Sequence, residues 1–173
     1  MKILAAVLGA FLLLGLWAVG AYNSIVGRNE ALSKAWATVE SQYQRRLDLV
    51  PNLVATVKGS AKFEKETLTA VVEARARVGS MTIGKGVLED PSSFKKFEEA
   101  QAGLSSALSR LMVVVEKYPD IKSTQGFGDL HVQLEGTENR IAVARNDFNA
   151  AAQDYNTAIK VFPGARVAGF GGF

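Results

Sequence analysis

The sequence predicts an all-α protein in which an N-terminal transmembrane helix precedes an antiparallel bundle of long helices, similar to a four-helix bundle. Residues 3–22 carry no charge and are mostly apolar. Through most of the remaining chain, apolar residues recur at intervals of three and four, as on one face of an α-helix. No stretch alternates convincingly with period two, and no Asn-Gly or Asp-Gly hairpin signal occurs. We therefore expect an anchor over residues 1–22, a helical bundle over 23–163 and a Gly/Phe-rich tail over 164–173.

The first 22 residues form the expected anchor. At about 1.5 Å per residue, a helix from Ile3 to Tyr22 is roughly 30 Å long, which matches the hydrocarbon core of a bilayer. Trp17 and Tyr22 lie toward its far end, where amphipathic rings favour the interface. A cleaved signal peptide is the alternative, because Lys2 gives a positive start and residues 18–21 include small side chains. We expect a single-pass protein of the cell membrane with the lipid bilayer as a partner. Positive residues flank both ends of the stretch, so the sequence does not decide on which side of the membrane the bundle lies.

Four apolar series predict the helices of the bundle. Glu64 and Arg75 interrupt the second series, and Gln101 interrupts the third. The series consist of Ile25, Leu32, Trp36, Val39 and Tyr43; Val54, Val57, Ala61, Leu68, Val71 and Val78; Phe94, Phe97, Leu104, Leu108, Leu111, Val115 and Tyr118; and Phe127, Leu130, Leu134, Thr137, Ile141, Ala144, Phe148, Ala151, Tyr155, Ala158 and Phe162. Such series predict helices long enough to pack at shallow crossing angles.

Prolines and glycines divide these series. Asp90 before Pro91 is typical of an N-cap followed by a first-turn proline. The residues 117–120 around Pro119 predict a helix end and a polar connector. After Pro163, four glycines and two phenylalanines in the segment 164–173 favour a mobile or docking tail over another helix, with Phe170 and Phe173 as the docking residues.

Pro51 lies inside a stretch that otherwise favours a helix. A proline in a helix interior costs about 3 kcal/mol or more, because one hydrogen bond is lost and the ring clashes with the preceding turn. In the first turn of a new helix that cost is much smaller. We therefore expect either a kink at Pro51 or a break and restart over Asp48–Asn52.

Polar residues gather around this proline and again near residue 138. The two groups are Arg45, Arg46, Asp48 and Asn52, and Glu138, Asn139 and Arg140. Three interpretations stay open: surface charge, a partly buried network that sets helix register, and a ligand site. Gly136 inside the fourth series suggests the close approach of another helix.

Composition and motifs exclude several classes of function. The absence of Cys excludes disulfides, thiolate metal sites, a Cys nucleophile and an acylated lipobox Cys. The net charge of +3 is dispersed, and no basic stripe indicates a nucleic-acid partner. His131, Glu135 and Glu138 can share a helical face, but one His at this spacing favours a face flanking the seam over a metal site. We expect no catalytic residue, metal or cofactor.

Three blocks of the sequence resemble the bacterial LemA family. They are AWATVESQYQRRLDLVPNLVATVKG, EKETLTAVVEARA and LEGTENRIAVARNDFNAAAQDYNTAIKVFP. The resemblance covers Tyr22 to about Pro163 and implies a membrane-anchored domain of long antiparallel helices without an established catalytic activity. A magnetosome-associated member of the family implies roles in membrane organisation.

These observations together predict a non-enzymatic scaffold or adaptor that self-associates as a homo-oligomer or binds another membrane protein. The alternative is a bundle that binds a lipid or a small anionic ligand at Arg45, Arg46 and Arg140.

Overall fold

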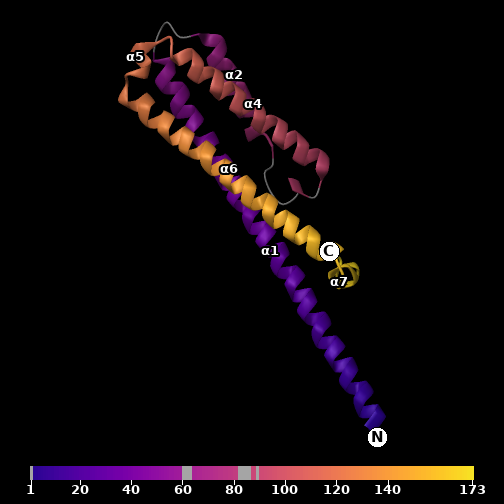
Figure 1. Cartoon of the computed structure of the whole chain (residues 1–173). Helices are drawn as coiled ribbons and strands as arrows, with labels where there is room; N and C mark the ends of the chain where they lie inside the picture. The colour runs from indigo at the N-terminus through magenta and orange to yellow at the C-terminus, as the bar shows by residue number, and fades with distance from the viewer. Residues whose placement is uncertain (1, 60–63, 82–86, 89) are drawn as a thin grey trace. The chain divides into compact units, whose positions relative to one another are not determined.

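The computed structural model describes residues 2–59, 64–81, 87–88 and 90–173 (Figure 1). The described residues are helical almost throughout and contain no strand, so the all-α prediction is confirmed. The helices are α1 (Lys2–Lys58), α2 (Lys65–Gly79), α4 (Pro91–Val115), α5 (Pro119–Lys122), α6 (Gln125–Lys160) and α7 (Gly164–Gly171). The chain divides into two compact units that share α1 and α6: a first unit of Met1–Trp36 with Ala144–Phe173, and a second unit of Ala37–Val143.

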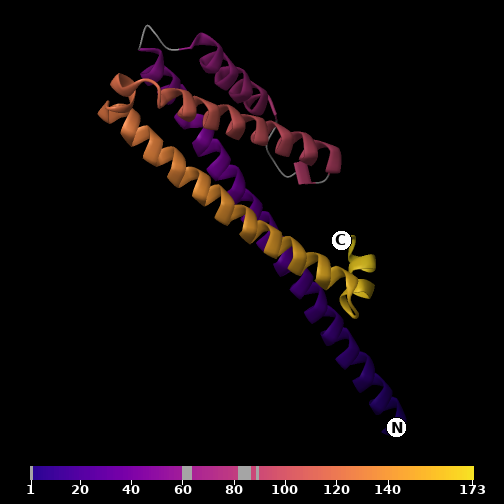
Figure 2. The same ribbon diagram turned by 45° about the horizontal axis from the view of Figure 1, so that its top comes forward.

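The second unit is a bundle of four helical segments around one apolar core. The C-terminal part of α1, α2, α4 and the N-terminal part of α6 follow one another in alternating directions (Figures 1 and 2). Because each helix has one apolar stripe, four of them can enclose a common core. The core consists of Leu47, Val50, Leu53, Val57, Val71, Ala74, Val78, Leu104, Leu108, Leu111, Val114, Val115, Ile121, Phe127 and Leu134.

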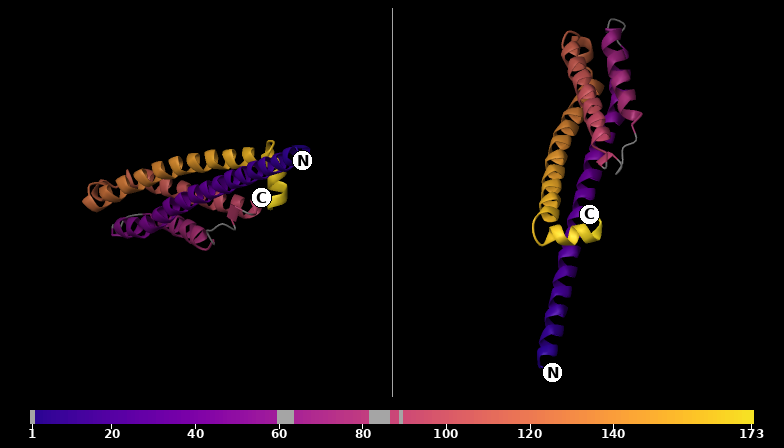
Figure 3. Two further views of the ribbon diagram at one scale, coloured as in Figure 1. Left: turned by 90° about the horizontal axis from the view of Figure 1, so that it is seen from below. Right: turned by 90° about the vertical axis from the view of Figure 1, so that its right-hand side faces the viewer.

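The first unit consists of the N-terminal part of α1, the C-terminal part of α6, and α7. The rings of Trp36 and Phe148 pack between α1 and α6, with their centroids 5.2 Å apart. The expectation that the tail is not helical is wrong, because residues 164–171 form α7, which lies crosswise on α1 (Figure 3). Gly164 and Ala168, one helical turn apart, are buried, so α7 has an inner face despite its glycines.

The four apolar series place their residues as expected, with one exception. Every described member is buried or half-buried except Phe162, whose exposed fraction is 77%. Phe162 follows the end of α6 at Lys160, so the helical period no longer aims its side chain at the core. The predicted N-cap is confirmed, because the Asp90 carboxylate accepts hydrogen bonds from the amides of Ser92 and Ser93 at the start of α4.

The helix does not break at Pro51. Residues 48–52 are helical within α1, so the break and restart is wrong, and the kink stays a prediction. Because Pro51 has no amide hydrogen, it cannot bond to the carbonyl of Leu47 one turn earlier. The side chain of Arg75 on α2 supplies a substitute donor: its Nε lies 3.1 Å from the Leu47 oxygen. The proline thus creates an acceptor on α1 that α2 uses.

Candidate functional site

The most deeply buried charge in the second unit is the guanidinium of Arg46, which has an exposed fraction of 1%. Its Nη1 donates to Ser105 Oγ at 2.6 Å and to Glu138 Oε1 at 2.9 Å. Its Nη2 donates to the backbone oxygen of Gln101 at 3.3 Å and to the Gln101 side-chain oxygen. One side chain on α1 therefore links α4 and α6.

Aromatic rings complete this site. The Arg46 guanidinium carbon lies 5.1 Å from the centroid of the Tyr43 ring, within the range of a cation–π interaction. Tyr43 in turn packs edge to face on Phe97, with centroids 5.3 Å apart. Desolvation offsets much of the attraction in an ion pair with a buried member, so the expected role of the arrangement is to set helix register more than to add stability, and this role stays a prediction.

The other residues of the predicted polar group lie elsewhere. Arg45, Asp48 and Asn52 are exposed on α1, and Asp48 accepts a hydrogen bond of 2.8 Å from Gln44. Asn139 and Arg140 are exposed on α6. The structure thus brings together Arg46 and Glu138 out of the predicted set. While Arg46 makes these bonds, its guanidinium cannot join Arg45 and Arg140 in holding an anionic ligand at the surface.

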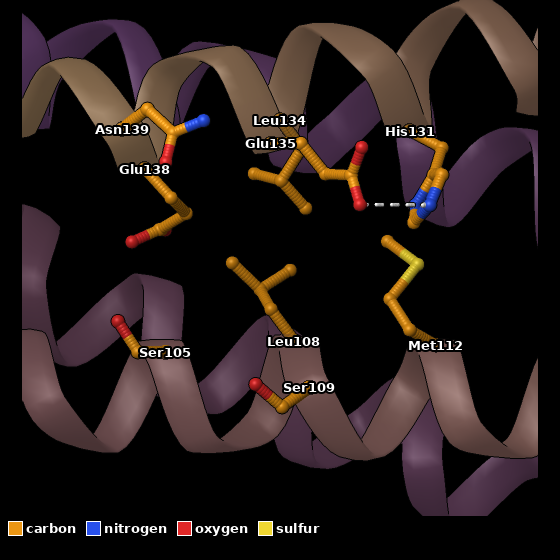
Figure 4. Close-up of a pocket in the computed structure, with 9 residues that line it drawn as sticks. All are labelled: Ser105, Leu108, Ser109, Met112, His131, Leu134, Glu135, Glu138 and Asn139. Carbon is orange, nitrogen blue, oxygen red and sulfur yellow. Dashed lines mark ion pairs between the residues drawn. The ribbon is translucent and has the colours of Figure 1, made fainter.

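A groove of about 590 Å³ lies between α4 and α6 of the second unit (Figure 4). Leu108 and Leu134 point toward each other across it, and the carboxylates of Glu135 and Glu138 lie on its α6 side. No Lys or Arg is among the described residues that line it. The lining residues are Ser105, Leu108, Ser109, Met112, His131, Leu134, Glu135, Glu138 and Asn139. The groove therefore combines an apolar floor with acidic character.

The three residues considered for a metal site line this groove without converging. His131 Nε2 lies 3.4 Å from Glu135 Oε1, as the dashed line in Figure 4 shows, whereas Glu138 bonds to Arg46. In the part of the chain that the structure describes, no group of three or more His, Cys, Asp or Glu side chains is placed to hold a metal ion.

Gly136 does not mark a close helix contact. A Cβ atom built there would meet nothing within 4 Å, so the expected approach of another helix at this glycine is wrong. Gly136 lies on the same stripe of α6 as Val132 and Val143, which are exposed.

Sequence reasoning missed Gln101 and Ser105 as partners of Arg46 and, outside this site, Arg75 as the donor to the Leu47 carbonyl. Gln101 and Arg75 could have been identified, since each interrupts an apolar series. A polar residue on the apolar face of a helix needs a buried hydrogen-bond partner, unless the helix turns that residue away from the core. Ser105 could not have been identified, because a serine beside an apolar stripe is common on any helix surface.

In the first unit, the apolar N-terminal stretch of α1, residues 3–22, is largely exposed; this stretch is called the apolar half of α1 below. The most apolar window of 18 residues in α1 has a mean hydropathy of 2.4, and none of it is buried. Among the described residues, α1 is the helix that is long and apolar enough to cross a membrane. Where this half ends, Trp17 packs on Phe162 and Tyr22 packs on Phe173, with centroids 6.0 and 5.4 Å apart.

Comparison with known proteins gives one family match and several relatives. The model of the LemA family matches residues 35–173. "Magnetosome protein MamQ 2" of Paramagnetospirillum magneticum is 32% identical to this chain over 169 residues. "Magnetosome protein MamQ" of Magnetospirillum gryphiswaldense is 31% identical over 170 residues. Each match covers 88% of this chain and 62% of the relative. "Protein LemA" of Metamycoplasma hominis is 21% identical over 144 residues, with 83% and 62% covered. The chain thus spans about 62% of the length of these relatives.

Proposed function

Because the chain belongs to the LemA family, we propose that it is a non-enzymatic, single-pass membrane protein that acts as an adaptor in membrane organisation. Its anchor is the apolar half of α1, and its binding surface is the groove between α4 and α6. No catalysis is proposed, because polar side chains at the groove contact one another: Arg46 contacts Glu138, and His131 contacts Glu135.

The observation that carries the proposal is the uncovered apolar half of α1. A soluble protein buries such a stretch, since roughly 25 cal/mol is gained for each Å² of apolar surface removed from water. Here Phe11, Leu12, Leu13 and Leu14 are each at least 60% exposed. A helical apolar stretch of this length matches the thickness of the hydrocarbon core of a bilayer. Retention of this segment is supported by the continuity of α1 and by the contact of Trp17 with Phe162.

The groove supports an adaptor role by its chemistry. We assign it to an amphipathic helix of another membrane protein whose apolar face carries Lys or Arg at its edge. Such a helix would bury apolar anchors between Leu108 and Leu134, as in other helix-in-groove complexes. Its basic residues would complement the carboxylate of Glu135, whereas Glu138 already bonds to Arg46. A neutral or acidic helix would desolvate Glu135 without adding a positive charge.

Site-specific photo-crosslinking in bacterial membranes tests this assignment. A photoreactive residue replaces Ser109, which lines the groove, or Ser106, which is exposed on α4 but does not line it. We expect a crosslink from position 109 alone, to a helical segment that carries Lys or Arg, and we expect Glu135→Lys to reduce its yield. Crosslinks from both positions, or to an acidic segment, would refute the groove as the binding surface.

Self-association is a second part of the proposal. The exposed stripe of α6 that contains Val132, Gly136 and Val143 presents apolar groups with space for a second copy of this chain beside the glycine. Native mass spectrometry of the full chain in nanodiscs measures it directly. A homo-oligomer that Gly136→Leu disperses supports this surface, and a monomer at micromolar concentration refutes self-association.

A further inference from the structure

The end of α6 and α7 expose apolar side chains that the first unit does not cover. Phe170 near the end of α7 is 94% exposed, and Val161 and Phe162, which directly precede α7, are exposed as well. Several large apolar groups exposed within one short segment indicate an interaction with another apolar phase. Phe173, by contrast, is half-buried against Tyr22, so it belongs to the packing of the first unit.

Two ring contacts set the level of this patch along α1. Phe162 packs on Trp17, and Phe173 packs on Tyr22. These two positions on α1 are separated by about 7.5 Å along the helix axis. If residues 3–22 fill the hydrocarbon core, Tyr22 lies at its edge and Trp17 about 7.5 Å inside it. Phe162 then lies among the outer acyl-chain segments, and the C-terminal end of α7 lies near the headgroup boundary.

The orientation of α7 agrees with this level. α7 lies crosswise to α1, so it runs along the membrane plane when α1 crosses the membrane (Figure 3). Its buried residues Gly164 and Ala168 face inward, whereas Arg166 and Phe170 lie about 200° from them on the outer face. A Cβ at Gly171 would approach the Tyr22 ring within 3.1 Å, so α7 is held closely against α1.

The charged side chains within residues 155–173 are both basic. Lys160 directly precedes Val161 and Phe162, and Arg166 lies between Phe162 and Phe170 in the sequence. Basic residues beside an apolar face are the pattern of helices that lie on anionic membranes, where each Lys or Arg near the surface is attracted to acidic headgroups.

We propose that α7 and the adjoining residues Val161 and Phe162 form an interfacial collar around the anchor. In this collar Phe162 inserts among the outer acyl-chain segments, Phe170 inserts near the headgroup boundary, and Lys160 and Arg166 reach anionic lipid headgroups. The inference rests on the proposed function, since it takes residues 3–22 to be the membrane span. It assigns the predicted docking residue Phe170 to lipid instead of to a protein neighbour.

Depth-dependent quenching tests the collar. The sequence contains no Cys, so one introduced Cys can carry an environment-sensitive fluorophore at a single position of the full chain. The positions are Phe170, Leu12 in the span, and Asn149, which is exposed beside Phe148 and thus near the level of Trp36, about 21 Å past Tyr22 along α1. The variants are reconstituted in nanodiscs of phosphatidylcholine and phosphatidylglycerol, with or without bromine distributed along the whole length of the acyl chains.

We expect bromine to reduce fluorescence at Phe170 and Leu12 but not at Asn149, and aqueous iodide to quench Asn149 most strongly. Loss at Leu12 without loss at Phe170 would overturn the collar and leave the anchor intact. Protection at Phe170 from both quenchers would also overturn it, because a protein neighbour would then cover the patch. No loss at Leu12 would overturn the span itself. A label at Phe162 provides a second site with the same expectation as Phe170.

Discussion

Replacing Arg75 by Met is expected to destabilise the second unit only as long as Pro51 is present. The Arg75 Nε donates to the Leu47 carbonyl, which has no helical donor because residue 51 is a proline. Loss of this charge-assisted bond at a half-exposed site should cost about 1.5 kcal/mol, near the lower end of the range for charged donors. For a chain of this length, that corresponds to a fall in Tm of about 3–6 °C.

Pro51→Ala supplies the missing amide. Pro51 is exposed, so the substitution removes little packing and should stabilise α1 by about 1–3 kcal/mol, a part of the usual cost of an interior proline. In this background the Leu47 carbonyl has its own helical donor, so Arg75→Met should cost much less. We expect a coupling of about 1 kcal/mol in the double-mutant cycle.

Thermal unfolding of the full chain in mild detergent, followed by circular dichroism, measures the four variants of this cycle. Arg77→Met, an exposed arginine two residues along α2, is the matched control and should leave Tm nearly unchanged. If Arg75→Met lowers Tm equally with Pro51 and with Ala at that position, within the roughly 0.5 kcal/mol expected of independent sites, the reasoning is refuted.

Three further predictions concern single sites. Arg46→Ala should cost about 1–3 kcal/mol in thermal unfolding, because it leaves the buried Gln101 side chain without its hydrogen-bond partner, while Glu138, which is 40% exposed, can be hydrated. Arg45→Ala next to it should stay within about 0.5 kcal/mol. Equal effects would contradict the buried network. The hydroxyl of Ser93, followed by the hydroxyl and amide of Ser92, lowers the pKa of Asp90 from 3.8 to about 2. Since the unfolded chain binds more protons between these two pKa values, the contribution of Asp90 to stability is complete above pH 4 and is lost as the pH falls toward 2. Asp90→Asn keeps a cap but does not titrate, so it should flatten the Tm profile between pH 4 and 2. An unchanged profile would argue against this role of Asp90. A Cβ at Gly164 would lie 1.9 Å from a backbone oxygen of α6, so Gly164→Ala should displace α7 and speed proteolysis of the tail. Gly169 has open space around it, so Gly169→Ala should leave the rate of proteolysis unchanged. Equal rates for the two variants would contradict the packing of α7.

Local patterns predicted the features that depend on neighbouring residues. The apolar series, the Asp90 cap and the apolar half of α1 each follow from a few consecutive positions, so the sequence contains all that is needed to infer them. The tail shows where such reasoning fails. Its glycines argue against a helix when taken alone, but burial of Gly164 and Ala168 within the first unit stabilises one.

The contacts across the bundle were harder to predict. Arg46 and Glu138 are 92 residues apart, and their pairing depends on which rows of three helices face one another. The sequence showed the candidate polar residues on α1 and α6, but of the Arg46 partners on α4, Gln101 was recognisable only as an interruption of an apolar series and Ser105 was not recognisable. At Pro51, local rules indicated a break because they do not include Arg75, a donor that arrives from another helix.

The central claim is that residues 3–22 cross a membrane and hold the helical units to it. Its most direct test is the accessibility of single cysteines to an impermeant maleimide in sealed membrane vesicles containing the full chain. Lys2 and Glu30, which are exposed, flank the stretch, and Leu12 lies within it. The account predicts that Cys at positions 2 and 30 are labelled from opposite sides of the membrane and that Cys at position 12 is protected. Labelling of positions 2 and 30 from the same side, or labelling of position 12, would contradict it.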